Sequence, residues 1–99
     1  MEAANFIKGF MDRVPEDPEI SAFHVSVYLA LVYYGQNIAG KTSFTVFSRE
    51  VLPLAKVSRP GTYHQLLGDL ARRGYIEYSP SHSPVIGSLV TLVSFGLKD

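Results

Sequence analysis

The sequence contains no cysteine, so disulfide bonds and thiolate metal sites are excluded. Its three histidines, His24, His64 and His82, are far apart in the sequence, and no carboxylates are paired outside the segment 15–19. We therefore expect neither a metal site nor a cofactor, and the chain offers no nucleophile and base for an enzyme. The apolar run 23–34 is too short to cross a bilayer, which predicts a cytoplasmic protein without membrane contact.

An excess of one charge sign is also lacking, because nine Lys and Arg balance nine Asp and Glu. This balance argues against strong non-specific binding of nucleic acid by the whole chain. The distribution is uneven: residues 1–20 hold five acidic and two basic side chains, whereas residues 41–76 hold six basic and two acidic ones. A DNA-binding domain whose N-terminal segment faces away from the phosphates would show this asymmetry, and so would ordinary scatter of surface charge.

The 99 residues, 46% of them hydrophobic, suit one folded domain with a modest core. Apolar spacing predicts a helix over 3–14, a solvated acidic linker at 15–19, and a central, largely apolar helix from a Ser21 cap to about residue 36. A short strand at 41–46 should pair with a later hairpin. Ser48 is a candidate cap for a short helix, which Pro53 either kinks or delays.

The stretch 58–76, SRPGTYHQLLGDLARRGYI, is the most informative segment. Ser58 is the expected cap of a helix over 58–73, Pro60 is tolerated in its first turn, and Gly74 supplies the left-handed residue that stops it. One face of this helix is apolar, and the other is polar and free to contact a partner. The segments 75–78 and 88–95 then read as a β-hairpin around a Ser- and Pro-rich loop.

This order of elements resembles that of winged helix-turn-helix proteins, with one extra helix at the N-terminus. More narrowly, HVSVYLAL, TYHQLLGDLARRGYIEY and SPSHSPVIGS are similar to segments of small winged-helix proteins of bacterial mobile elements. The resemblance implies a mainly α fold with a small β-hairpin (α+β) in a single winged-helix domain over 1–99. The N-terminal helix and acidic linker would occupy residues 1–20 and the winged-helix core residues 21–95.

The resemblance also implies sequence-specific binding of double-stranded DNA, by a transcriptional regulator or a mobile-element accessory factor. The recognition helix would lie at about 58–73 and the wing at about 79–88, a wing that contains no Lys or Arg. In the first turns of such a helix, side chains meet base edges in the major groove, whereas basic and hydroxyl side chains nearby hold phosphates. The expected DNA-binding residues are Lys56, Ser58, Arg59, Gly61, Thr62, His64, Gln65, Arg72, Ser81, His82 and Ser83.

Two further expectations concern partners. The N-terminal helices carry more apolar surface than one small domain can cover, which favours a homodimer that presents two recognition helices to adjacent half-sites. The alternative function is a winged helix used for protein-protein contact without direct DNA binding, and the neutral net charge is its best support. Arg72 and Arg73 could contact phosphates or simply satisfy the last carbonyls of their helix.

Overall fold

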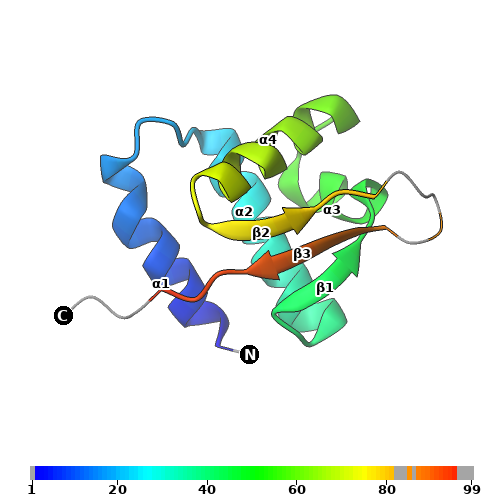
Figure 1. Cartoon of the computed structure of the whole chain (residues 1–99), viewed down its shortest axis with the longest axis horizontal. Helices are drawn as coiled ribbons and strands as arrows, with labels where there is room; N and C mark the ends of the chain where they lie inside the picture. Colours follow the sequence, from blue (N-terminus) through cyan, green and yellow to red (C-terminus); the bar gives the residue numbers. More distant parts are fainter. Residues whose placement is uncertain (1, 82–84, 86, 96–99) are drawn as a thin grey trace.

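A computed structural model describes residues 2–81, 85 and 87–95 of the chain (Figure 1). Within this part, four α-helices accompany a small three-stranded antiparallel sheet, so the fold is mainly helical and of the α+β class, as predicted. In chain order the elements are α1 (Ala3–Arg13), the 3₁₀ turn η1 (Val14–Glu16), α2 (Ala22–Tyr34), the π-helical turn η2 (Gly35–Ala39), β1 (Ser43–Val46), α3 (Ser48–Ala55), α4 (Pro60–Arg72), β2 (Ile76–Ser79) and β3 (Ser88–Leu92).

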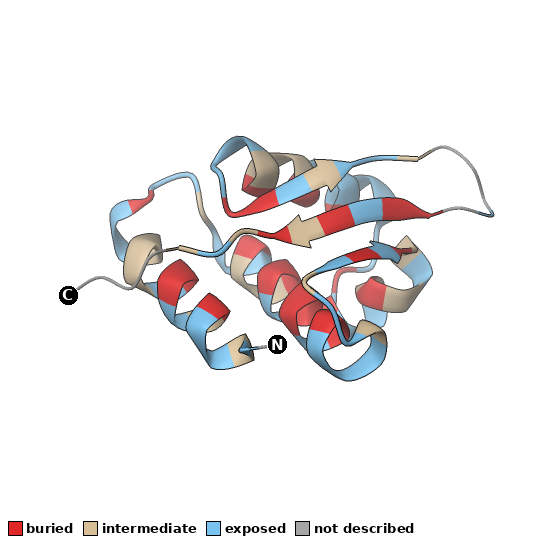
Figure 2. Cartoon of the chain, turned by 60° about the horizontal axis from the view of Figure 1, so that its bottom comes forward, coloured by how far each residue is buried: buried red, intermediate tan, exposed pale blue. Residues whose placement is uncertain are grey.

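Helix α2 is the centre of the molecule. It packs against α1, α3 and α4, and Val27, Tyr28 and Leu31 on it are fully buried (Figure 2). Its start follows the predicted cap, because the Ser21 backbone N–H donates to His24 Nδ1 at 2.9 Å and the Ser21 hydroxyl lies 2.8 Å from the same nitrogen. The nearly continuous apolar sequence of α2 is therefore explained by the helices that pack on several of its sides.

Helix α1 belongs to the same core. The Phe10 ring stacks on Tyr28 with centroids 3.9 Å apart and meets the edge of Tyr75 at 5.0 Å. The Tyr28 hydroxyl also donates to the Phe6 carbonyl. Gly9 lets the chain after β3 approach closely, since a Cβ there would lie 3.1 Å from the Phe95 side chain. The apolar face of α1 is thus used inside the chain.

The sheet has the order β1-β3-β2, with β3 in the middle. Ile76 is paired with Leu92 across β2 and β3, and Ser43 with Thr91 across β1 and β3, so the strand before α3 joins the hairpin as predicted. Alternate residues face the helices, and Phe44, Val46, Ile76, Val90 and Leu92 are buried there.

Helix α4 begins two residues later than predicted, and the Ser58 cap is wrong. Arg59 is the N-cap residue, with extended backbone (φ −111°, ψ 123°), and no side-chain hydrogen bond from a described residue caps the helix. The residue before a proline is forced into this extended region, so Pro60 fixes the start of the helix and leaves Ser58 outside it. The other end is as predicted: Gly74 has a φ of 85° and follows the last turn.

Ser48 is not a cap either. It is the first residue of α3, and Phe47 before it is the N-cap. The Glu50 carboxylate, three residues on, accepts the Phe47 N–H at 2.9 Å and supplies the cap that Ser48 was expected to give. Helix α3 therefore starts at Ser48 and contains Pro53, and its start is not delayed.

Candidate nucleic-acid interface

The outer face of α4 and the turn before it hold most of the predicted DNA-binding residues. Tyr63, Leu66, Leu67 and Leu70 are buried and anchor the helix on its inner face. The opposite face is open to solvent over the first turn and a half, to Gln65, and again at Arg72. The exposed predicted residues are Lys56, Ser58, Arg59, Gly61, Thr62, His64, Gln65 and Arg72.

The turn between α3 and α4 is held by its backbone and by one buried side chain. Lys56 closes α3 in the left-handed region (φ 59°, ψ 35°), and its N–H bonds the Leu52 carbonyl. Val57 is buried and pins the turn to the core, so the neighbouring Lys56 and Arg59 side chains point outward. Both cations are therefore presented beside the first turn of α4.

The end of β2 lies beside α4. His64 Nδ1 is 3.1 Å from the Tyr78 hydroxyl, and a hollow of about 220 Å³ is lined by His64, Tyr78, Pro80 and Ser81. Figure 1 shows the start of α4 and the outer end of β2 on the same side of the molecule. The structure thus brings Ser81, of the expected wing, next to the predicted recognition helix. His82 and Ser83 lie outside the described residues.

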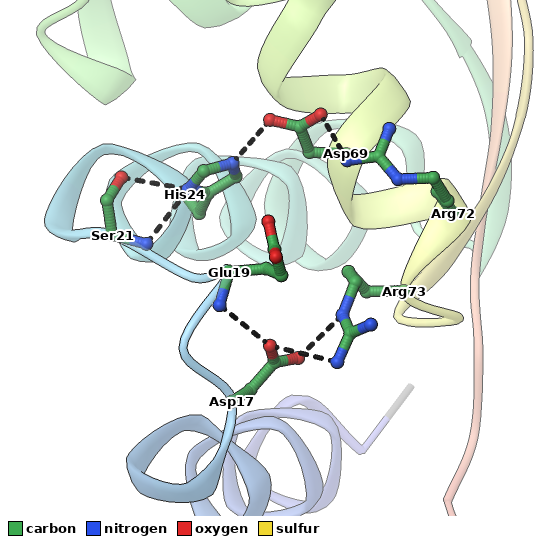
Figure 3. A network of polar contacts seen from close by, with 7 residues as sticks. All are labelled: Asp17, Glu19, Ser21, His24, Asp69, Arg72 and Arg73. Atoms are coloured by element: carbon green, nitrogen blue, oxygen red, sulfur yellow. Dashed lines mark hydrogen bonds and ion pairs between the residues drawn. The ribbon is translucent and has the colours of Figure 1, made fainter.

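Asp69 in the middle of α4 is less exposed than the polar residues one turn away, Gln65 and Arg72. Its carboxylate accepts His24 Nε2 at 2.8 Å and Arg72 Nη2 at 2.8 Å (Figure 3). Because the Ser21 N–H donates to His24 Nδ1, the imidazole carries its proton on Nε2 and donates it to Asp69. These hydrogen bonds, from His24 first and then from Arg72, hold the pKa of Asp69 below its usual value.

A second carboxylate, Asp17, is buried, and the prediction of a solvated linker is wrong there. It accepts Arg73 through both oxygens at 3.1 Å, the Tyr75 hydroxyl at 2.7 Å and the Glu19 N–H at 3.1 Å. The hydrogen bonds from Tyr75 and Arg73 lower the pKa of Asp17, and burial helps to raise that of Tyr75 to about 12. Arg73 therefore ties the linker to the end of α4.

These two carboxylates change the expected roles of the arginines that end α4. Arg72 is paired with Asp69, and Arg73 is paired with Asp17. Both charges therefore already have a partner inside the chain that is neither a phosphate nor one of the last carbonyls of α4. Arg72 keeps a largely exposed side chain (64%) and can still offer donors to a partner.

The exposed positions of α4 and of the turn before it contain no acid. The sequence has no Asp or Glu from residue 51 to residue 68. At the two ends of this range, Asp69 is turned toward His24, and Glu50 accepts the Phe47 N–H and the Tyr34 hydroxyl. Lys56 and Arg59 therefore give the turn and the start of α4 a positive potential despite the neutral chain.

Two glycines flatten the outer face of α4. A Cβ at Gly61 or Gly68 would meet no atom within 4 Å, so neither glycine is needed for packing inside the chain. Each lowers the stability of the helix by about 1 kcal/mol relative to Ala. Close approach of a neighbouring helix of the chain therefore does not account for either glycine.

No protein-family model matches this chain, and comparisons with curated proteins and with solved structures found no match either. Within the described residues, no group of three His, Cys, Asp or Glu side chains could hold a metal ion. None of the helices in this part is long and apolar enough to span a membrane.

One residue of this region was missed from the sequence. Phe23, in the first turn of α2, is 61% exposed and lines a hollow with Lys56, Arg59 and Thr62. Helical spacing groups Phe23 with the buried Val27 one turn later, so periodicity predicts burial. Only the packing of α2 against the α3–α4 turn reveals its exposure.

Proposed function

We propose that the chain is a winged helix-turn-helix protein that binds double-stranded DNA in a sequence-specific manner. Helices α3 and α4 would form the helix-turn-helix with α4 as the recognition helix, and the β2–β3 connection would be the wing. The observation that carries the proposal is the exposed surface formed by the outer face of α4 and the turn before it. Lys56 and Arg59 make this turn basic, no Asp or Glu occurs from residue 51 to residue 68, and the hairpin flanks the helix through His64 and Tyr78.

The first turns of α4 supply the side chains suited to base edges. Gln65 can pair with adenine and Arg59 with guanine, each through two hydrogen bonds, and Thr62 can contact a thymine methyl or a phosphate. His64 can donate to guanine or to a phosphate. Lys56 is the main phosphate anchor, with Ser58, Gly61, Arg72 and the wing residues Ser81, His82 and Ser83 as further positions.

The biological role inferred from the resemblance is that of a bacterial transcriptional regulator or mobile-element accessory factor. Such a protein acts without catalysis or cofactor, in the cytoplasm, where bacterial DNA lies. The proposal is supported by the order of α2, β1, α3, α4, β2 and β3, and by the central place of β3 in the sheet, which are those of winged-helix proteins.

A salt series tests the proposal. Labelled duplexes of random sequence are titrated with the protein, and the binding constant is measured by fluorescence anisotropy at several salt concentrations. With Lys56 and Arg72 as phosphate anchors, log K should fall against log salt with a slope of about −2. Absence of binding to every duplex at low salt would overturn the proposal.

Variants locate the interface. Replacing Arg59 and Gln65 together by Ala should relax the preference for the best-bound sequence over a random duplex. Lys8→Ala is the matched control for loss of a cation, because Lys8 lies on α1 and pairs with Asp12. Unchanged preference in the double variant would contradict the assignment of α4.

The alternative, a winged helix that contacts another protein, has one observation in its favour. An open groove of about 550 Å³ runs between α2 and α3, and its lining carries no charged side chain. Leu29 and Tyr33 on α2 are 40% and 51% exposed there, and Leu54 on α3 is 42% exposed. The residues that line this groove are Ala22, Val25, Ser26, Leu29, Ala30, Tyr33 and Leu54.

We assign the predicted homodimer to this groove and not to α1, whose apolar face is buried against Tyr28 and Tyr75. A two-fold axis would set the same uncharged residues of two copies against each other. Sedimentation velocity tests this: the protein should dimerise at high micromolar concentration, and Leu29→Glu should return it to monomer. A monomeric wild-type chain at all concentrations would contradict the dimer.

A further inference from the structure

A hollow of about 210 Å³ joins three elements at the edge of the candidate interface. It is formed by the first turn of α2, the α3–α4 turn and the first turn of α4. Its lining is mixed, with one aromatic ring, two cations, two hydroxyls and one buried aliphatic side chain. These residues are Phe23, Lys56, Val57, Ser58, Arg59 and Thr62.

The aromatic ring in this hollow is open to solvent. Phe23 is 61% exposed, and among the described large apolar side chains only Val85 is more exposed. Its neighbour His24 is buried and hydrogen-bonded through both ring nitrogens, so the backbone at Phe23 is held in place. Phe23 is therefore a fixed apolar group beside a basic turn.

The charges around the hollow favour an anionic ligand. Lys56 and Arg59 are exposed on its rim, and no carboxylate lines it. A ligand that fits must present negative charge next to an apolar surface. A DNA strand does so at every nucleotide, because each phosphate is followed by the carbon face of a deoxyribose. Arg59 and Thr62 also belong to the face proposed to read bases, so one strand can reach both.

We propose that Phe23 is a further DNA-contacting residue, whose ring packs on a deoxyribose while Lys56 holds the adjacent phosphate. This inference rests on the proposed DNA binding. A contact to sugar carries no base information and involves no charge, so Phe23 contributes affinity equally on all sequences and leaves the salt dependence unchanged. Covering roughly 60 Å² of the ring corresponds to about a tenfold change in Kd.

The test uses the full chain and two labelled duplexes, the best-bound sequence from a random pool and an unrelated one. Phe23→Ala should bind both duplexes about tenfold more weakly, with the salt slope of the wild type. Lys56→Ala should lower the slope by about one. Ile38→Ala is the matched control, because Ile38 is 58% exposed, on η2, and does not line the hollow.

Conservative variants keep the test independent of folding. Phe23→Leu, which retains apolar area, should recover most of the affinity, whereas Phe23→Gln, of similar length, should not. Thermal melting of each variant is measured alongside. Wild-type affinity in Phe23→Ala and Phe23→Gln would overturn the inference, and so would a loss confined to one duplex, which would mean base readout.

Failure of the inference and failure of the proposed function are distinguishable. If the wild type binds duplex DNA and the Phe23 variants bind equally well, only the role of Phe23 is lost. If the wild type binds no duplex, both are overturned. If the wild type binds no DNA but binds a glutamate-rich peptide through Phe23, the hollow is a site for a protein partner. That result would also overturn both the role of Phe23 and the proposed DNA binding.

Discussion

Replacing Asp69 by Ala distinguishes two roles for an acid in the middle of a DNA-binding helix. If Asp69 faced the DNA, its removal would raise affinity and leave the fold unaffected. In the structure the Asp69 carboxylate instead accepts a hydrogen bond of 2.8 Å from His24, whose side chain is 8% exposed. Because the Ser21 N–H donates to His24 Nδ1, the proton of His24 is on Nε2, and Asp69→Ala removes the acceptor that the described residues give it.

The magnitude follows from this geometry. A buried donor without a partner costs about 1–3 kcal/mol, and the exposed pair with Arg72 adds at most about 1 kcal/mol. We expect Asp69→Ala to lower the free energy of unfolding by about 2 kcal/mol. For a domain of this size that is a fall in Tm of roughly 8–16 °C.

The assay is urea unfolding followed by far-UV circular dichroism, since the chain has no tryptophan. Glu77→Ala is the matched control for charge, because Glu77 is exposed on β2, and its change should stay within about 0.5 kcal/mol. In a double-mutant cycle, Asp69→Ala and His24→Ala should be strongly non-additive. Wild-type stability in Asp69→Ala, or additivity in the cycle, would refute the reasoning.

Three further predictions concern other parts of the chain. The Tyr63 hydroxyl is buried without a hydrogen-bond partner among the described residues, so Tyr63→Phe should raise stability by about 1 kcal/mol in urea unfolding; a loss would contradict this. Gly61→Ala should raise the melting temperature by roughly 4–8 °C, because its Cβ meets nothing and Ala stabilises a helix by about 1 kcal/mol over Gly, but it should weaken DNA binding by blocking close approach; undiminished affinity would argue against that approach. The lowered pKa values of Asp17 and Asp69 stabilise the fold fully above the ordinary carboxyl value of 3.8, and this contribution disappears as pH falls through the lower folded values. Acid unfolding should thus begin at higher pH in Asp17→Asn, and an unchanged midpoint would count against the linker contact.

The order and type of the elements could be predicted from the sequence because their causes are local. The spacing of Tyr63, Leu67 and Leu70 defines the inner face of α4, and Gly74 ends the helix in the left-handed region that it favours. Helix starts were less predictable. A serine before a helix suggests a cap, but Pro60 imposes extended backbone on Arg59 and so moves the start past Ser58.

The features that the sequence did not reveal depend on contacts between distant residues. Asp17 is in an acidic stretch that reads as solvated, yet its partners Arg73 and Tyr75 lie more than fifty residues away. Asp69 likewise pairs with His24, from a helix near the start of the chain. Local composition contains no information about such pairings, and only the packing of α2 against α4 brings these groups together.

The most direct test of DNA binding by α4 is an NMR titration of the labelled protein with the best-bound duplex. Backbone amide shifts should change over residues 56–65, at Phe23 and around Ser81, whereas α1 and Tyr33 should be unaffected. Shifts confined to the groove between α2 and α3, or no shifts at all, would contradict the account.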